Sequence, residues 1–409
     1  MRDPVPPTDP VTLTDVFLTF LRLGMTSFGG PLAHIGYFRR EFVERRGWID
    51  DDAFAQIVAF CSILPGPTSS QVGMIVGTVR GGWRGTVLAW LGFTLPSALA
   101  MGAFGFALRA IEAAGSEPRW YTGLLAGLTA AASAVVAQAV LALARSQCPD
   151  RETQTVAFGA TILALVLQAV PGLQWIPILV GALVGALFLR RSAQVATSTL
   201  PLAIAAPVAI ACAIGFMLIV ATAAAIANAG DAGVLCATLV RAGTLVFGGG
   251  HIILPLLQSL VGDGLFAAHD FYAGYGAAQA LPGPLNTFAT FLGVANLSPL
   301  HGLAGGIVAT LLIFAPSFLL VFALAPVWNR LRTDRLAIGA LRGAGAAVVG
   351  LLGAVLYSPL IVTLAGDLTR IAIALGAFAL IVVWKAPPWA VVASAAAIGA
   401  LSGLAGAPL

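Results

Sequence analysis

The chain has 409 residues, of which 59% are hydrophobic and only 9% are charged, and its mean hydropathy is +0.95. Soluble domains carry about 25% charged residues, so this composition excludes an ordinary soluble protein. The net charge of +4 falls largely on arginines at the ends of apolar segments, which fits membrane loops better than nucleic-acid binding. Runs near the ~20 residues that span a bilayer recur along the chain. We therefore predict an all-α polytopic membrane protein.

The apolar segments form a group of six, then a single segment, then a second group of six. Residues 1–10 are expected to form a polar, proline-rich tail rather than a signal peptide. We predict a first repeat over 11–191, a linker with one transmembrane helix over 192–230, and a second repeat over 231–409. The segments fall near 11–36, 53–79, 84–109, 121–145, 155–170, 173–190, 202–227, 234–262, 270–297, 301–327, 336–363, 369–384 and 387–406.

The two groups of six segments are copies of one another. "RLGMTSFGG", from Arg22, aligns with "RAGTLVFGG", from Arg241, and "LPGP" recurs at Leu64 and Leu281. Further blocks, including Pro-Ser pairs after each PGP, align in the same order at nearly constant spacing. Internal repeats with interrupted hydrophobic segments at corresponding places are typical of secondary transporters.

Arginine positions predict how the copies are oriented. The loop at 39–46 carries four arginines, whereas its counterpart at 259–269 carries neither arginine nor lysine. By the positive-inside rule these loops lie on opposite sides of the membrane, which favours inverted repeats. The loop at 330–335, however, carries more arginines than its counterpart at 109–119. A segment that enters and returns would explain this, so the number of crossings stays open.

Two PGP sequences interrupt apolar segments. Proline removes a backbone donor and clashes with the preceding turn, and in lipid the freed groups must face protein or water. Hydroxyl and amide side chains that follow each break are N-cap types, so each break is expected to start a half-helix whose N-terminus attracts anions. The alternative is a packing kink. The candidate binding residues are Pro65, Gly66, Pro67, Thr68, Ser69, Ser70, Pro282, Gly283, Pro284, Asn286 and Thr287.

The glycine-rich stretches form a second pair of predicted breaks. Glycines allow close backbone approach and leave N–H groups free to cradle an anion. An arginine within a membrane segment is a functional-site candidate whose guanidinium matches oxyanions, although it could instead reach the lipid interface. A histidine could donate to the anion or carry a proton, or be structural. The candidates are Arg22, Ser27, Phe28, Gly29, Gly30, Pro31, His34, Arg241, Phe247, Gly248, Gly249, Gly250 and His251.

Motifs of enzymes and of metal sites are missing from the sequence. There is no HExxH, GxSxG or Walker loop, and the four cysteines lack metal-binding spacing. We therefore expect no enzyme activity, no metal and no cofactor. Asp15 is a further candidate, as a proton carrier. Without an ATP site, transport must use an ion gradient or the gradient of the substrate.

The motifs "FGGPLAH", "LPGPTSSQVG", "FGGGHIILPLL" and "LPGPLNTFATFLG" resemble the signatures of the chromate ion transporter family in its long, two-domain form. The resemblance covers about 14–363. It implies a multi-pass protein of the bacterial inner membrane that exports chromate, confers chromate resistance and acts as a proton antiporter. It also implies functional roles for Arg22, His34, the FGG residues and the PGP residues.

Chromate is a tetrahedral dianion, and the predicted breaks offer the donors and partial positive charge that it needs. A transporter or exchanger of sulfate or another oxyanion remains an alternative, as does an anion channel. The expected partners are the oxyanion and membrane lipid, with no nucleic acid. A homodimer is left open.

Overall fold

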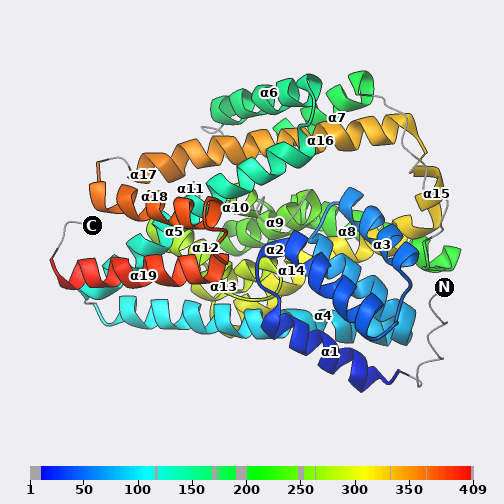
Figure 1. Cartoon of the computed structure of the whole chain (residues 1–409), viewed down its shortest axis with the longest axis horizontal. Coiled ribbons are helices and arrows are strands. Elements are labelled where there is room, and N and C mark those ends of the chain that lie inside the picture. The colour runs from blue at the N-terminus through cyan, green and yellow to red at the C-terminus, as the bar shows by residue number, and fades with distance from the viewer. Residues whose placement is uncertain are drawn as a thin grey trace.

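The computed structural model describes residues 11–115, 118–167, 173, 175–189, 200–246, 253–262, 264–331, 333–364 and 366–406, and their regular structure is helical (Figure 1). The first repeat contains α1 (Leu13–Thr26), α2 (Gly30–Phe38), α3 (Asp51–Ile63), α4 (Thr68–Ala113), α5 (Arg119–Gln147), α6 (Arg151–Leu167) and α7 (Ile176–Phe188). The linker helix is α8 (Ala206–Ile226). The second repeat contains α9 (Gly230–Leu245), α10 (Ile253–Leu257), α11 (Ser259–Gly262), α12 (Ala268–Ala280), α13 (Phe288–Ala295), α14 (Gly302–Leu324), α15 (Trp328–Leu331), α16 (Arg335–Val355), α17 (Val362–Leu364), α18 (Leu368–Val382) and α19 (Pro388–Leu404).

Among the described helices, five are long and apolar enough to cross a membrane: α4, α5, α8, α14 and α16. Helices α7, α18 and α19 are apolar but shorter. The sequence predicts thirteen apolar segments, and the difference arises because glycine and proline divide several of them into helices below the ~20 residues that a crossing requires. The all-helical membrane architecture is as expected, with fewer full-length helices.

The chain reverses direction at the first glycine break. Helix α1 ends at Thr26 and α2 begins at Gly30, and Gly29 between them has a φ of 98°, which glycine adopts without a steric penalty. The Phe20 ring of α1 lies 6.0 Å from that of Phe38 and 5.1 Å from that of Phe42. Helices α1 and α2 therefore form an antiparallel hairpin, and Ser27 lies at its tip.

The first PGP sequence forms the tip of a second hairpin. Near the end of its first part, α4 carries Arg80, which donates hydrogen bonds to the carbonyls of Gly47 and Trp48, just before α3 begins. The first part of α4 thus returns to the end where α3 started. In the second repeat the Leu297 N–H donates to the Leu265 carbonyl at 3.2 Å, which likewise joins the end of α13 to the start of α12.

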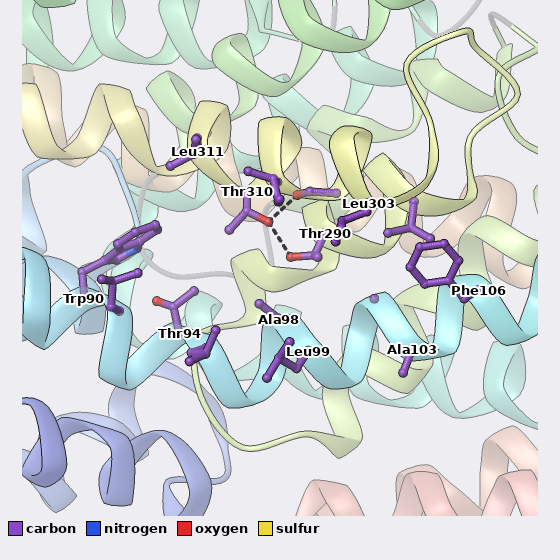
Figure 2. A pocket seen from close by; sticks show the side chains of 16 residues that line it. Trp90, Thr94, Ala98, Leu99, Ala103, Phe106, Thr290, Leu303, Thr310 and Leu311 are labelled. Atoms are coloured by element: carbon purple, nitrogen blue, oxygen red, sulfur yellow. Dashed lines mark hydrogen bonds between the residues drawn. The ribbon is translucent and has the colours of Figure 1, made fainter.

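Each PGP hairpin is followed by a further reversal into a long helix. Gly82 within α4 has a φ of 59° and a ψ of −152°, which breaks the helix. The Thr78 and Thr86 hydroxyls then meet at 2.7 Å across the turn. In the second repeat the Thr290 and Thr310 hydroxyls meet at 2.7 Å between α13 and α14 (Figure 2).

The two long helices, α4 and α14, run antiparallel. Gly302 at the start of α14 lies beside Phe106 near the end of α4, and Trp90 contacts Phe314 and Phe318 further along, with ring centroids 5.6 and 5.3 Å apart. The hairpins of the two repeats therefore lie toward opposite ends of α4. In Figure 1, α1, α3 and α15 lie toward one end of the long axis and α18 and α19 toward the other.

The last helices of each repeat pack on a long helix of the other repeat. Helix α7 crosses α16 and α19 crosses α5 at glycines so close that an added Cβ would collide with the facing backbone. Small residues spaced four apart let helix backbones approach in this way. Arg342 of α16 also pairs with Asp150, just before α6, at 2.6 Å. The glycines are Gly181, Gly185, Gly339 and Gly343 at one crossing and Gly123, Gly127, Gly399 and Gly403 at the other.

Candidate substrate site

The helix breaks of the two repeats meet through a reciprocal pair of backbone hydrogen bonds. The Gly66 N–H donates to the Val246 carbonyl at 2.5 Å, and the Gly283 N–H donates to the Ser27 carbonyl at 2.9 Å. Gly66 and Gly283 are the central residues of the two PGP sequences. Val246 and Ser27 each directly precede the Phe-Gly-Gly of the other repeat. Each PGP tip is therefore anchored to the glycine break of the opposite repeat.

Both PGP glycines are required by their conformation and their surroundings. Gly66 has a φ of 127°, and an added Cβ would lie 2.6 Å from Gln71 Nε2 and 2.9 Å from Ser317 Cβ. Gly283 has a φ of 95°, and an added Cβ would lie 2.8 Å from Ser97 Oγ. Ser97 and Ser317 are equivalent residues of the two repeats, so each faces the PGP tip of the other. The N–H groups of these glycines already bind carbonyls and are not free for an anion.

The helices that start after the PGP tips leave their first N–H groups without a side-chain cap. The N-cap of α4 is Pro67, and the N-cap of the 3₁₀ turn Leu285–Thr287 is Pro284; neither offers a capping side chain. Helix N-termini carry unpaired donors and partial positive charge, which attract anions. Both tips therefore present such an N-terminus inside the protein.

His34 joins the tip of the α1–α2 hairpin to the start of α4. Its side chain is buried, with Nε2 3.1 Å from the Ser27 carbonyl and Nδ1 3.1 Å from Ser69 Oγ. Since a carbonyl only accepts, Nε2 carries the proton, and in the neutral ring Nδ1 accepts the Ser69 hydroxyl. The ring also stands edge-on to Phe93 at 5.4 Å. His34 thus fixes the tip and orients Ser69.

Several buried polar side chains around the tips have atoms without a hydrogen-bond partner. A buried polar atom left unpaired costs about 1–3 kcal/mol, and such atoms are rare in native interiors. Because several of them lie near the starts of helices, this region is the candidate site for a polar ligand. The atoms are Ser27 Oγ, Ser70 Oγ, Gln71 Oε1, Thr94 Oγ1, both side-chain polar atoms of Asn286, and Ser317 Oγ.

Most of the described PGP candidates are buried at the tips. Thr68, Ser69 and Ser70 form the buried first turn of α4, and Asn286 and Thr287 are buried at the second tip. The Thr287 hydroxyl donates to the Pro284 carbonyl at 2.9 Å. Pro65 and Pro282 are half-buried, and Gly66, Pro67, Gly283 and Pro284 are buried.

The FGG candidates are more dispersed. Gly29 is exposed, Gly30 and Pro31 are half-buried, and the Phe28 ring lies 5.8 Å from that of Trp389 in α19. Ser27 and His34 are the members of this group that are buried at the tips. Phe247, Gly248, Gly249, Gly250 and His251 lie outside the described residues.

The charged candidates do not join this buried cluster. Arg22 is exposed on α1, and Arg241 is half-buried on α9. Asp15 forms a capping box with Thr12 at the start of α1, a structural role for the residue we considered as a proton carrier. The buried polar residues near the tips are neutral throughout the described ranges.

Sequence reasoning missed Gln71, Thr94, Ser97 and Ser317. A signal was present, because Gln71 follows the PGP motif directly and the Pro-Ser pairs align between the repeats. Single polar residues on apolar helices are easily read as packing residues, and their burial near the PGP tips is visible only in the structure.

A pocket of about 470 Å³ between α4, α13 and α14 is a poor site for an anion (Figure 2). Its lining is largely leucine and other apolar residues, and the Thr290 and Thr310 hydroxyls in it already bond each other. Thr94 lines this pocket and lies one helical turn before Ser97, which faces the second PGP tip. No group of three or more His, Cys, Asp or Glu residues that could hold a metal occurs among the residues described.

Comparison with known proteins decides the family. The model of the chromate transporter family matches residues 14–230 and 233–400. The chain belongs to the chromate transporter family. Its two matched segments suggest duplicated halves, and membership makes it a transporter rather than an enzyme.

Curated relatives of this family align over most of the chain. The chromate transport protein of Pseudomonas aeruginosa is 32% identical over 358 residues, covering 86% of this chain and 81% of that protein. The probable chromate transport protein of Synechococcus elongatus is 26% identical over 326 residues, covering 76% and 75%. The chromate transport protein of Cupriavidus metallidurans is 27% identical over 353 residues, covering 84% and 82%. No solved structure matches the chain.

Proposed function

We propose that this chromate transporter family member exports chromate across the bacterial inner membrane, driven by the proton motive force as a proton antiporter, and confers chromate resistance. The observation that carries the proposal is the cluster of buried, unpartnered hydroxyls and amides where the helix breaks meet. An oxyanion needs several donors and partial positive charge at once. The uncapped starts of α4 and of the turn at Leu285 add that charge.

We further propose two inverted repeats, over 11–191 and 231–409, joined by a linker over 192–230. In this topology the α1–α2 hairpin and the hairpin of α3 with the first part of α4 are re-entrant. The antiparallel course of α4 and α14 supports it. It also accounts for the arginine pattern, because three crossings by α4, α5 and α8 then separate the repeats.

The packing at the end of α14 is consistent with this topology. Val321, Ala325 and Trp328, at the end of α14 and just beyond it, share a hydrophobic cluster with Phe42 and Trp48 of the first repeat. The arginine-rich stretches at 39–46 and 330–335 then lie on one side, as the positive-inside rule requires. Labelling of single cysteines in these loops from either side of sealed vesicles tests the assignment.

Everted membrane vesicles test the transport proposal. We expect labelled chromate to accumulate in vesicles energised by a pH gradient, to saturate, and to be abolished by an uncoupler. Competition by sulfate at equal concentration would favour the alternative of a broader oxyanion exchanger, and flux that neither saturates nor responds to the uncoupler would favour a channel. Replacement of each PGP should reduce uptake at equal protein abundance, whereas Arg22→Ala and Arg241→Ala test whether arginines outside the buried cluster also take part. The mass of the detergent-solubilised protein tests a homodimer.

A further inference from the structure

The amide of Gln71 is held so that its oxygen is the unpaired atom. Gln71 is fully buried, and its Nε2 donates to the Pro65 carbonyl at 2.8 Å. Because that carbonyl only accepts, the orientation of the amide is fixed. The Oε1 atom, on the other branch, has no donor. The site therefore contains a buried acceptor as well as donors.

The neighbours of Gln71 place this acceptor at the candidate site. A Cβ added to Gly66 would lie 2.6 Å from the Gln71 Nε2 and against the Ser317 hydroxyl, so the amide and the hydroxyl converge on the PGP tip. Ser70, the preceding residue, also has an unpaired hydroxyl. Asn286 at the second tip offers one unpaired donor and one unpaired acceptor. A bare oxyanion has only acceptor atoms and would leave the Gln71 oxygen unsatisfied.

The charge of the surroundings also bears on the ligand. Ser27, Ser70, Gln71, Asn286 and Ser317 are all neutral, and the exposed side chain of Arg22 is not buried among them. Burying an ion without a counter-ion is costly, and the cost rises steeply with charge. Helix N-termini contribute only about half a positive charge each. As far as the described residues go, this environment favours a monoanion over a dianion.

We propose that the site takes its oxyanion in the singly protonated form, with the ligand O–H donated to Gln71 Oε1. This inference rests on the proposed oxyanion site and names the form of ligand that it binds. Chromate accepts a proton near neutral pH, whereas sulfate and selenate stay fully deprotonated until the solution is strongly acidic. Protonation thus distinguishes chromate from sulfate, although the two have the same tetrahedral shape.

Other titratable groups lie on the elements around the start of α4. They are Asp15 and Arg22 on α1, His34 and Tyr37 on α2, Asp51, Asp52 and Cys61 on α3, and Asp231, Cys236 and Arg241 on α9, whereas α14 carries none. A change of charge on a neighbouring group acts on both oxyanions, so their affinities are compared at the same pH. The protonation of the ligand itself is then read from a fall of the ratio by a full factor of ten per pH unit.

Equilibrium dialysis of the purified full chain in lipid nanodiscs supplies this ratio. The ligands are micromolar chromate and selenate, a deprotonated tetrahedral oxyanion of nearly the same size. We expect the ratio of the selenate Kd to the chromate Kd to exceed ten at pH 6 and to fall about tenfold per pH unit above the pKa of chromate. A ratio that stays constant with pH, or stays near one, overturns the inference while leaving the transport proposal intact. No chromate binding at any pH overturns both.

A variant tests the assigned acceptor. Gln71→Met removes the amide at similar volume, and we expect it to bring the ratio at pH 6 close to one with little change in the selenate Kd. The control is Gln154→Met, whose amide also donates to a backbone carbonyl, that of Cys148, at 3.2 Å but at the start of α6. If Gln71→Met keeps the wild-type ratio, Gln71 is not the acceptor. The wild-type ratio remains decisive if the variant fails to fold.

Discussion

The backbone N–H of Gly283 donates a hydrogen bond to the carbonyl of Ser27, 2.9 Å away, and so joins helix breaks that belong to different repeats. The mirrored bond from Gly66 to Val246 makes the contact two-fold. Each PGP glycine thus holds the opposite repeat, while several polar side chains near it have atoms without partners. In our proposal these side chains, and not the glycine N–H groups, bind the ligand.

Gly283→Ala is expected to abolish chromate resistance. The residue has a φ of 95°, and its new Cβ would lie 2.8 Å from Ser97 Oγ and 3.2 Å from the Phe93 carbonyl oxygen. A left-handed conformation alone costs an alanine about 1–2 kcal/mol. Resistance of expressing cells, measured with immunoblots of membrane protein, checks the outcome. Gly376→Ala is the control, since no atom lies within 4 Å of its added Cβ; equal resistance in both variants contradicts the prediction.

Asn286→Leu is expected to stabilise the protein and to stop transport. Neither polar atom of its buried amide has a partner, so removal of the amide relieves a penalty of about 1–3 kcal/mol. A residue that costs stability and is needed for activity is typical of a binding site. Thermal unfolding in detergent and chromate uptake in vesicles give the two measurements.

A second buried asparagine serves as the matched control. Asn296 donates to the carbonyls of Leu292, Gly293 and Leu300 at 3.0, 2.7 and 3.0 Å and accepts from the Ser298 N–H at 2.9 Å. Asn296→Leu should therefore lower the unfolding temperature. If both variants shift the unfolding temperature in the same direction, Asn286 is not distinguished from a structural asparagine such as Asn296.

A disulfide is expected to form between Thr78→Cys and Thr86→Cys in a background without the native cysteines. Their hydroxyls lie 2.7 Å apart, whereas residues eight apart in an unbroken helix are separated by about 12 Å, too far for a disulfide. Loss of maleimide labelling after mild oxidation, with peptide mass spectrometry, detects the bond. The pair Thr78→Cys and Thr94→Cys should remain reduced, which shows that the oxidation is specific. Failure of the Thr78→Cys and Thr86→Cys pair to oxidise would argue against the reversal at Gly82.

Glu41→Gln is expected to lower stability at neutral pH but not in acid. Burial raises the pKa of Glu41, but hydrogen bonds from Arg46 and Arg45 outweigh this effect, so the pKa lies below its usual value. The stability that a depressed carboxyl pKa provides is present above the unfolded pKa of about 4.3 and is lost as the pH falls through the folded pKa. The gap in unfolding temperature between wild type and variant should accordingly close below that pH.

Glu44→Gln provides the comparison for Glu41. Glu44 pairs with Arg39 where both side chains are about half exposed, at 51% and 45%, and exposed ion pairs contribute little. We expect an unfolding temperature near that of the wild type at every pH. A larger loss for Glu44→Gln than for Glu41→Gln would contradict the assignment.

The local breaks could be predicted from the sequence because their cause is local. Proline at 65, 67, 282 and 284 removes N–H donors wherever the chain goes, and the helices do end there. The reversal at Gly82 also falls where the sequence separates the apolar segments 53–79 and 84–109. The sequence could not show that Arg22 is exposed while Gln71 is buried, because the difference depends on which faces the opposite repeat covers.

The crossed packing of the terminal helices limits how this protein can move. Helix α7 of the first repeat is seated on α16 of the second, and α19 of the second on α5 of the first, through backbone contacts at glycine. Each repeat therefore holds a terminal helix of the other through contacts between helix backbones. We expect a movement that alternates access to leave these crossings in place and to occur at the hairpin tips, where the PGP glycines give the backbone its conformational freedom.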